Sequence, residues 1–113
     1  MTPRRELQRA AGSDGPAAAF AAAALGDGPP AARLPDAIRA LVLHRGPGSS
    51  ICPSDAARAV GGDSWRELMA PAREAAADLA RAGSVDITQG GEPVDPDGPW
   101  RGPIRIRQRP STR

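Results

Sequence analysis

A single cysteine and a single histidine are the first candidates for chemistry in this sequence. Cys52 precedes Pro53, where we expect a helix to begin, and the positive end of a helix dipole would favour a thiolate, although Asp55 opposes it. A lone cysteine beside Ile51 is more often a small buried hydrophobe, so its reactivity stays open. His44 lies at an expected helix end, where it would cap carbonyl groups.

Neither residue has the partner residues that catalysis or metal binding requires. One cysteine cannot form an internal disulfide or a multi-cysteine zinc site, and no nucleophile and base fall into a recognisable pairing. The glycines at 46–48 and 61–62 lack the spacing and the lysine of a phosphate loop. We therefore expect a non-enzymatic protein with no metal and no cofactor.

Arginines are concentrated at the end of the sequence. Residues 101–113 hold five arginines and no acid, whereas residues 36–100 hold six arginines and ten acids. Such a basic segment can engage phosphates, which makes Arg101, Arg105, Arg107 and Arg109 candidates for nucleic-acid contact. The alternative is that Arg105 and Arg107 pair across a hairpin with Asp86 and neighbouring acids, while Arg109 is solvated.

A predicted helix over 65–82 offers two further candidate contacts, Arg66 and Arg73. With its capping residues from Asp63 it carries three arginines and four acids, so it would repel a phosphate backbone unless the acids face away. We do not expect this helix to read bases. Two alternatives stay open. The hairpin that follows this helix could contact DNA or RNA, or the domain could bind a protein partner.

Alternation and helical spacing predict the elements that would carry these side chains. The pattern indicates an α+β winged-helix domain over 34–109, with Trp65 and Trp100 in its core. Pro71 would bend the third helix unless that helix begins later. In order, we expect a helix at 34–44, a short strand at 49–52, helices at 53–60 and 65–82, a strand at 84–89, a long wing at 90–102 and a strand at 103–109.

Composition sets the flanking segments apart from this domain. Residues 1–33 are rich in alanine, glycine and proline, which predicts a disordered, flexible tail, and residues 110–113 a flexible end. Within the tail, Ala17–Leu25 would be helical only when packed against a partner or the domain. No export signal or membrane span is indicated, so we expect a cytoplasmic protein.

Four short runs resemble the signature of a small bacterial family of unknown function. They are the runs at 51–54, 63–69, 93–96 and 101–105, which read ICPS, DSWRELM, PVDP and RGPIR. The resemblance covers about residues 36–107 and implies a winged-helix-like fold with no established activity. Some relatives carry a cysteine-rich, zinc-finger-like N-terminal segment, but residues 1–33 contain no cysteine or histidine, so no zinc role is carried over.

These observations lead to one functional hypothesis and one rival. The hypothesis is a winged-helix module that contacts nucleic acid through its wing and Arg-rich last strand. The rival is a protein-interaction module that uses the acidic third helix or the N-terminal segment. Salt dependence separates them, because phosphate contacts release counterions and weaken steeply as salt rises.

Overall fold

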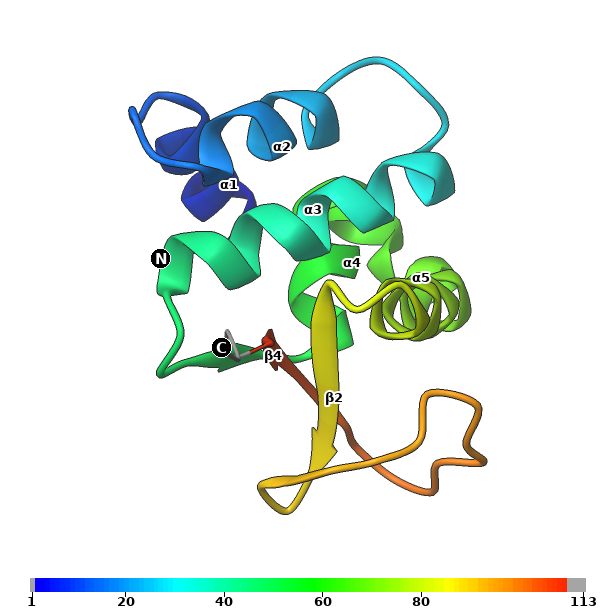
Figure 1. Ribbon diagram of the computed structural model, residues 1–113. Coiled ribbons are helices and arrows are strands. Elements are labelled where there is room, and N and C mark those ends of the chain that lie inside the picture. The colour runs from blue at the N-terminus through cyan, green and yellow to red at the C-terminus, as the bar shows by residue number, and fades with distance from the viewer. Residues whose placement is uncertain (1, 110–113) are drawn as a thin grey trace.

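The computed structural model describes residues 2–109, so the end predicted to be flexible, residues 110–113, lies outside the described part. The class is α+β, as predicted, with helices on both sides of a central helix and a sheet at one end (Figure 1). In chain order the elements are α1 (Pro3–Ala11), α2 (Ala17–Ala24), α3 (Pro30–Arg45), β1 (Ser50–Ile51), α4 (Pro53–Gly61), the 3-10 helix η1 (Gly62–Leu68), α5 (Met69–Arg81), β2 (Val85–Gln89), β3 (Glu92–Pro93) and β4 (Arg105–Gln108).

The N-terminal segment differs from the disordered tail predicted for it. It forms α1 and α2, which lie against α3 as an additional helical layer (Figure 1). Thr2 caps α1 by accepting a hydrogen bond from the Arg5 amide, and Leu7 is fully buried. In α2 the buried residues are Ala17, Ala21 and Ala24, one stripe at helical spacing. Alanine buries little area, but it lets two helices approach closely, and the composition argument overlooked this stripe.

The central helix α3 contacts elements on every side of it. Pro30 occupies its first turn, so the helix begins four residues before the predicted start, at a position where a missing amide donor costs nothing. Leu34, Ile38 and Leu41 are fully buried along it. These three side chains form the middle of the single core.

The third predicted helix is divided into two. Trp65 lies in η1, which has a kink at Ser64, and the change from 3-10 helix to α-helix at Met69 separates this segment from α5. Pro71 consequently falls in the first turn of α5, where its lack of an amide hydrogen breaks no bond. The alternative of a later helix start is therefore correct, and Trp65 is half-buried at the edge of the core instead of at its centre.

The four strands form one antiparallel sheet in the order β1-β4-β2-β3. The predicted hairpin is confirmed, because Ile87 pairs with Ile106 and Asp86 with Arg107 in the β2–β4 ladder. The predicted loop 90–102 is shorter than expected, since it begins with β3, which pairs with β2. Gly90 and Gly91 both have positive φ, as a two-residue hairpin turn between twisted strands requires.

The sheet has one buried and one outer face. The buried face points at α3 and α5 and carries β-branched side chains, as the alternation predicts. These side chains are Ile51, Val85, Ile87, Ile104 and Ile106, each at most 1% exposed. The opposite face is therefore free to hold polar side chains.

Candidate nucleic-acid interface

The outer face of the sheet brings together the arginines of the last strand. Residues paired across antiparallel strands lie on the same face, so Ser50, Arg107 and Asp86 form one cross-strand row. Arg105 and Thr88 form the next row. Arg105 is exposed, Arg107 is half-buried, and Thr88 beneath them is 4% exposed.

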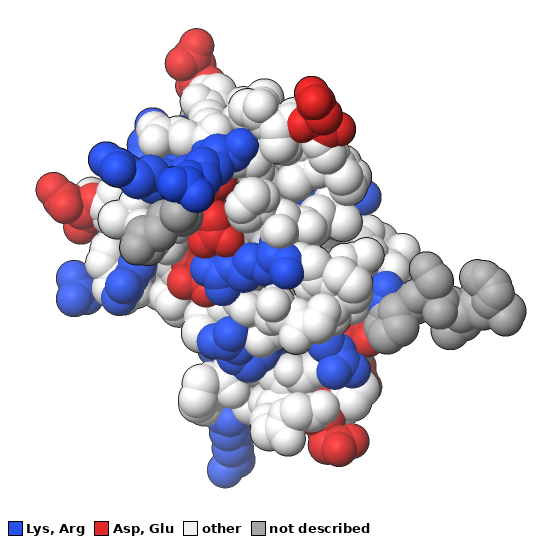
Figure 2. Space-filling model, turned by 90° about the vertical axis from the view of Figure 1, so that its left-hand side faces the viewer, with Lys and Arg blue, Asp and Glu red and all other residues white. Residues whose placement is uncertain are grey.

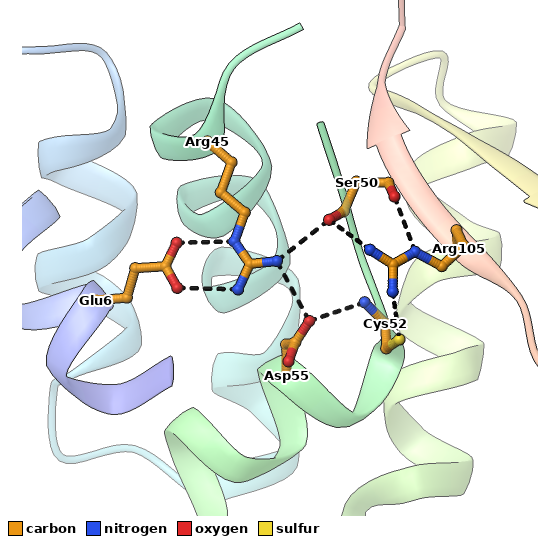
Figure 3. Close-up of polar contacts among 6 residues, drawn as sticks. All are labelled: Glu6, Arg45, Ser50, Cys52, Asp55 and Arg105. Atoms are coloured by element: carbon orange, nitrogen blue, oxygen red, sulfur yellow. Dashed lines mark hydrogen bonds and ion pairs between the residues drawn. The ribbon is translucent and has the colours of Figure 1, made fainter. Parts of the chain in front are cut away.

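Arg105 is held by β1 and not by an acid, contrary to the pairing with Asp86 that the hairpin suggested. Its Nε donates to Ser50 Oγ at 2.8 Å and its Nη2 to the Ser50 carbonyl at 2.9 Å (Figure 3). Its Nη1 lies 2.8 Å from Cys52 Sγ, which also accepts. These three acceptors orient the guanidinium, and Arg105 makes no ion pair with a carboxylate within residues 2–109.

Arg107 and Arg109 share the carboxylate of Asp86. Arg109 Nε donates to Asp86 Oδ1 at 3.0 Å, so Arg109 is not simply solvated as the alternative interpretation had it. Arg107 Nε lies 3.8 Å from Asp86 Oδ2, too far for a hydrogen bond. This Nε is buried and has no acceptor among the described residues. One carboxylate thus faces two arginines.

A pocket opens on the outer face between the sheet and the turn that precedes β1. Arg105 and Arg107 form its charged wall, and the serine and threonine side chains that line it have hydroxyl groups, which donate hydrogen bonds readily. Among residues 2–109, no acidic residue lines it. The lining residues are Pro47, Gly48, Ser49, Ser50, Thr88, Gly91, Arg105 and Arg107.

A second ionic group adjoins this pocket and fixes β1. Arg45, in the last turn of α3, makes a bidentate ion pair with Glu6 of α1 at 2.8 and 2.9 Å (Figure 3). It also donates to the Ser50 carbonyl and lies 3.5 Å from Asp55. The hydrogen bond from Arg45 holds the pKa of Glu6 below its ordinary value, and the same bond raises the pKa of Arg45.

The wing folds back onto α5. Trp100 Nε1 donates to the Asp95 carbonyl at 2.8 Å, and Arg73 lies over the Trp100 ring at 5.5 Å from its centroid. Arg81 bridges Asp97 of the wing and Asp78 of its own helix, and the bond to Asp97 raises the pKa of Arg81. Arg101 is exposed on the same wing. Of the two candidate contacts on the third helix, Arg73 therefore faces the wing.

The other candidate, Arg66, belongs to neither the sheet nor the wing. It belongs to η1, where its guanidinium lies 4.7 Å from the centroid of the Trp65 ring. It lines a separate pocket together with residues of α1 and α4. The six arginines singled out in the sequence therefore divide among four places, which are β4 and the residue after it (Arg105, Arg107 and Arg109), the wing (Arg101), α5 (Arg73) and η1 (Arg66).

The surface charge is arranged in separate groups. Figure 2 shows the side on which α1, the end of α3 and β1 lie, and its basic side chains form several islands divided by neutral surface. Acidic groups lie directly against the upper and middle islands (Figure 2). Positive charge is thus available on this side, but not as one continuous band.

The remaining candidates are accounted for by their positions. Cys52 is half-buried before α4, where its amide donates to Asp55 at 2.9 Å, and His44 is exposed in the last turn of α3. Within residues 2–109 no three His, Cys, Asp or Glu side chains are placed to hold a metal ion. In that same range, every helix is too short or too polar to cross a bilayer.

One comparison decides the family. Residues 31–109 match the family described as "Protein of unknown function (DUF3253)". The chain belongs to this family. The resemblance to a family of unknown function is therefore confirmed, while the DUF3253 description itself assigns no activity. A search of the curated proteins finds no match.

Sequence reasoning missed the acceptors that position the DUF3253 arginines. Ser50 lies 55 residues before Arg105, and only the β1–β4 pairing brings them together. Thr88 offered a usable signal, because it alternates with Ile87 on the predicted strand. The ion pair between Glu6 and Arg45 had no such signal in the sequence, since the segment that carries Glu6 was expected to be disordered.

Proposed function

We propose that the chain is a non-enzymatic winged-helix module that contacts nucleic acid through its wing and the arginines of β4. The order helix, strand, helix, helix, strand, wing, strand supports the fold part of this proposal. So does the sheet, in which β4 lies between β1 and β2. A single cysteine suits the reducing conditions of the cytoplasm, where we expect it to act.

The pocket on the outer face of the sheet supports the second part of this proposal, the contact with nucleic acid. In the described part of the chain, Arg105 and Arg107 line it without an acidic residue, and Arg107 Nε is a buried donor with no acceptor. A buried donor without a partner costs free energy, so an oxyanion that reached it would be favoured. Phosphate oxygens of a nucleic-acid backbone provide such acceptors, and Arg binds them in bidentate fashion.

We do not assign base reading to α5. Its Arg81 is engaged by Asp78 and Asp97, and its Arg73 faces Trp100 of the wing. A helix whose outer side meets the wing is not free to enter the major groove. The proposed contact is therefore made to the backbone and is independent of base sequence.

A charge-matched pair of variants tests the proposal. Arg105→Gln/Arg107→Gln removes two positive charges from the pocket, and Arg5→Gln/Arg9→Gln removes two exposed charges from α1. Fluorescence anisotropy with a mixed-sequence duplex and a single strand measures affinity from low to moderate salt. We expect the slope of log affinity against log salt to flatten by about 2 for the pocket variant only, because two phosphate contacts are lost.

A gain-of-affinity variant keeps the test independent of folding defects. Asp86→Asn removes the carboxylate that Arg107 and Arg109 share, while an amide oxygen can still accept from Arg109. Binding should strengthen several-fold at low salt, since phosphate no longer competes with Asp86. Absence of binding by the wild-type protein at low salt, or equal losses in both double variants, overturns the proposal and favours a protein partner.

A further inference from the structure

A second arginine cluster surrounds Trp65, away from the sheet. The Cζ atoms of Arg58 and Arg66 lie 4.3 and 4.7 Å from the centroid of the Trp65 ring. Arg58 comes from α4 and Arg66 from η1, so the contact is made by two elements and not by one helical turn. Trp65 is half-buried, and both arginines are exposed.

These side chains line a pocket that the N-terminal segment completes. Arg4 of α1 reaches it, with its Nη1 donating to the Ala59 carbonyl at 3.2 Å. Three arginines therefore meet in a pocket with no acid among the described residues that line it. The lining residues are Thr2, Pro3, Arg4, Arg58, Gly62, Trp65 and Arg66.

The charges in this pocket are not balanced by ion pairs. Within residues 2–109 the ion pairs of the structure involve Arg45, Arg81, Arg107 and Arg109, and none of the three pocket arginines. Asp63 and Glu67 of η1 are exposed and do not line the pocket. Three guanidinium groups without a carboxylate favour an anionic ligand.

The aromatic ring and the planar guanidinium groups add a second requirement. Tryptophan and arginine planes both provide stacking surfaces for a nucleobase. Guanidinium N–H groups donate in a fork that matches phosphate oxygens. Inorganic phosphate would interact only with the positive charges of the arginines. A nucleoside would use only the stacking surface.

We propose that the pocket between Arg4, Arg58, Arg66 and Trp65 binds a nucleotide, with the base stacked on the Trp65–arginine group and the phosphate held by the arginines. This inference is independent of the proposed contact at β4, because it uses none of those residues. The nucleotide is either free or the phosphorylated 5′ end of a strand. Both sources present the same ring and phosphate.

Tryptophan fluorescence provides a direct measurement. Trp100→Phe leaves Trp65 as the sole tryptophan, and titration with adenosine monophosphate should quench its emission in a saturable manner. Adenosine and inorganic phosphate, titrated separately, should each bind more weakly. If Trp100→Phe does not fold, calorimetric titration of the wild-type protein replaces the fluorescence readout.

Two arginine variants separate this pocket from general electrostatic attraction. Arg58→Gln should weaken nucleotide binding about tenfold or more, as loss of one charged hydrogen bond does. The matched control is Arg73→Gln, which removes an arginine that also faces a tryptophan, Trp100, and should leave affinity unchanged. Equal losses in the two variants would overturn the proposal.

The two ligand sources are distinguished by a short 5′-phosphorylated oligonucleotide. Tighter binding than the mononucleotide, lost in Arg58→Gln, assigns the pocket to a strand end, and equal binding assigns it to the free nucleotide. Oligonucleotide binding that depends on Arg105 but not on Arg58 excludes the strand end as the ligand and supports the β4 proposal, and the inference is overturned if Arg58→Gln also leaves mononucleotide binding unchanged. The inference also fails if no saturable change occurs up to concentrations on the order of 10 mM, where even a millimolar site is mostly filled.

Discussion

The two layers that flank α3 bury different kinds of side chain. The fully buried side chains of the α1–α2 layer are Leu7 and alanines, Phe20 and Leu25 pack half-buried against the core, and an ion pair joins Glu6 of this layer to Arg45. The sheet contributes β-branched residues such as Ile104 and Ile106 and needs no ion pair on its buried face. The first layer is held by close approach of small groups, and the second by large side chains that fill space.

The largest effect is expected where a large side chain is removed from the sheet. Ile106→Ala should cost about 3 to 5 kcal/mol in free energy of unfolding, and Leu7→Ala about 2 to 3 kcal/mol, because the cost of a cavity depends on how far its surroundings relax. Both residues are 0% exposed, so burial does not distinguish them. Urea unfolding monitored by circular dichroism gives both values, and a greater loss for Leu7→Ala would contradict the comparison.

Overpacking tests the close approach of α2 to α3. Ala21 is fully buried in α2, so Ala21→Leu should cost about 1 to 3 kcal/mol by forcing the helices apart. Ala22→Leu on the exposed side of the same helix is the matched control and should be nearly neutral. If both variants are neutral, α2 is not packed as closely as described.

The smallest effect concerns the ion pair between α1 and α3. Glu6→Gln should cost about 1 to 2 kcal/mol at neutral pH, since Arg45 keeps its contacts with Ser50 and Asp55. Because the folded-state pKa of Glu6 is lowered, the stabilisation is complete above the ordinary glutamate pKa and is lost as pH falls through the lower folded value. The unfolding free energies of wild type and variant should therefore converge in acid.

A control separates this pH dependence from that of other carboxylates. Glu67 is exposed on η1, and Glu67→Gln should leave a difference from wild type that is small at every pH. A difference for Glu6→Gln that stays constant from neutral to acidic pH would show that the ion pair does not stabilise the layer.

Local signals predicted the sheet and the α+β class well. Alternation of Val85 and Ile87 with polar residues, and of Ile104 and Ile106 with arginines, is a property of neighbouring residues. The start of α5 was less certain, because Pro71 is compatible with either a bend or a first turn. The structure selects the first turn, because α5 begins at Met69, after η1.

Composition misled the prediction for the N-terminal helices. An alanine-rich segment was expected to bury too little apolar surface to become ordered. The helical spacing of Ala17, Ala21 and Ala24, which form the buried stripe, was nevertheless visible in the sequence. The candidate site was predicted in part, since the arginines were identified but not their partners. Ser50 meets Arg105 through a strand pairing that spans the domain, and no local pattern encodes it.

The strand order has a consequence for the way the chain is made. The last strand in the sequence, β4, is the inner partner of both β1 and β2, so neither can pair with it until β4 has emerged from the ribosome. The helices α1 to α4, by contrast, can associate while synthesis continues, because all four precede β2, β3 and β4 in the chain and contact one another. Before β4 is available, we therefore expect a helical subdomain in which β1 and β2 each keep an unpaired hydrogen-bonding edge, and Arg105–Gln108 then pairs with both edges.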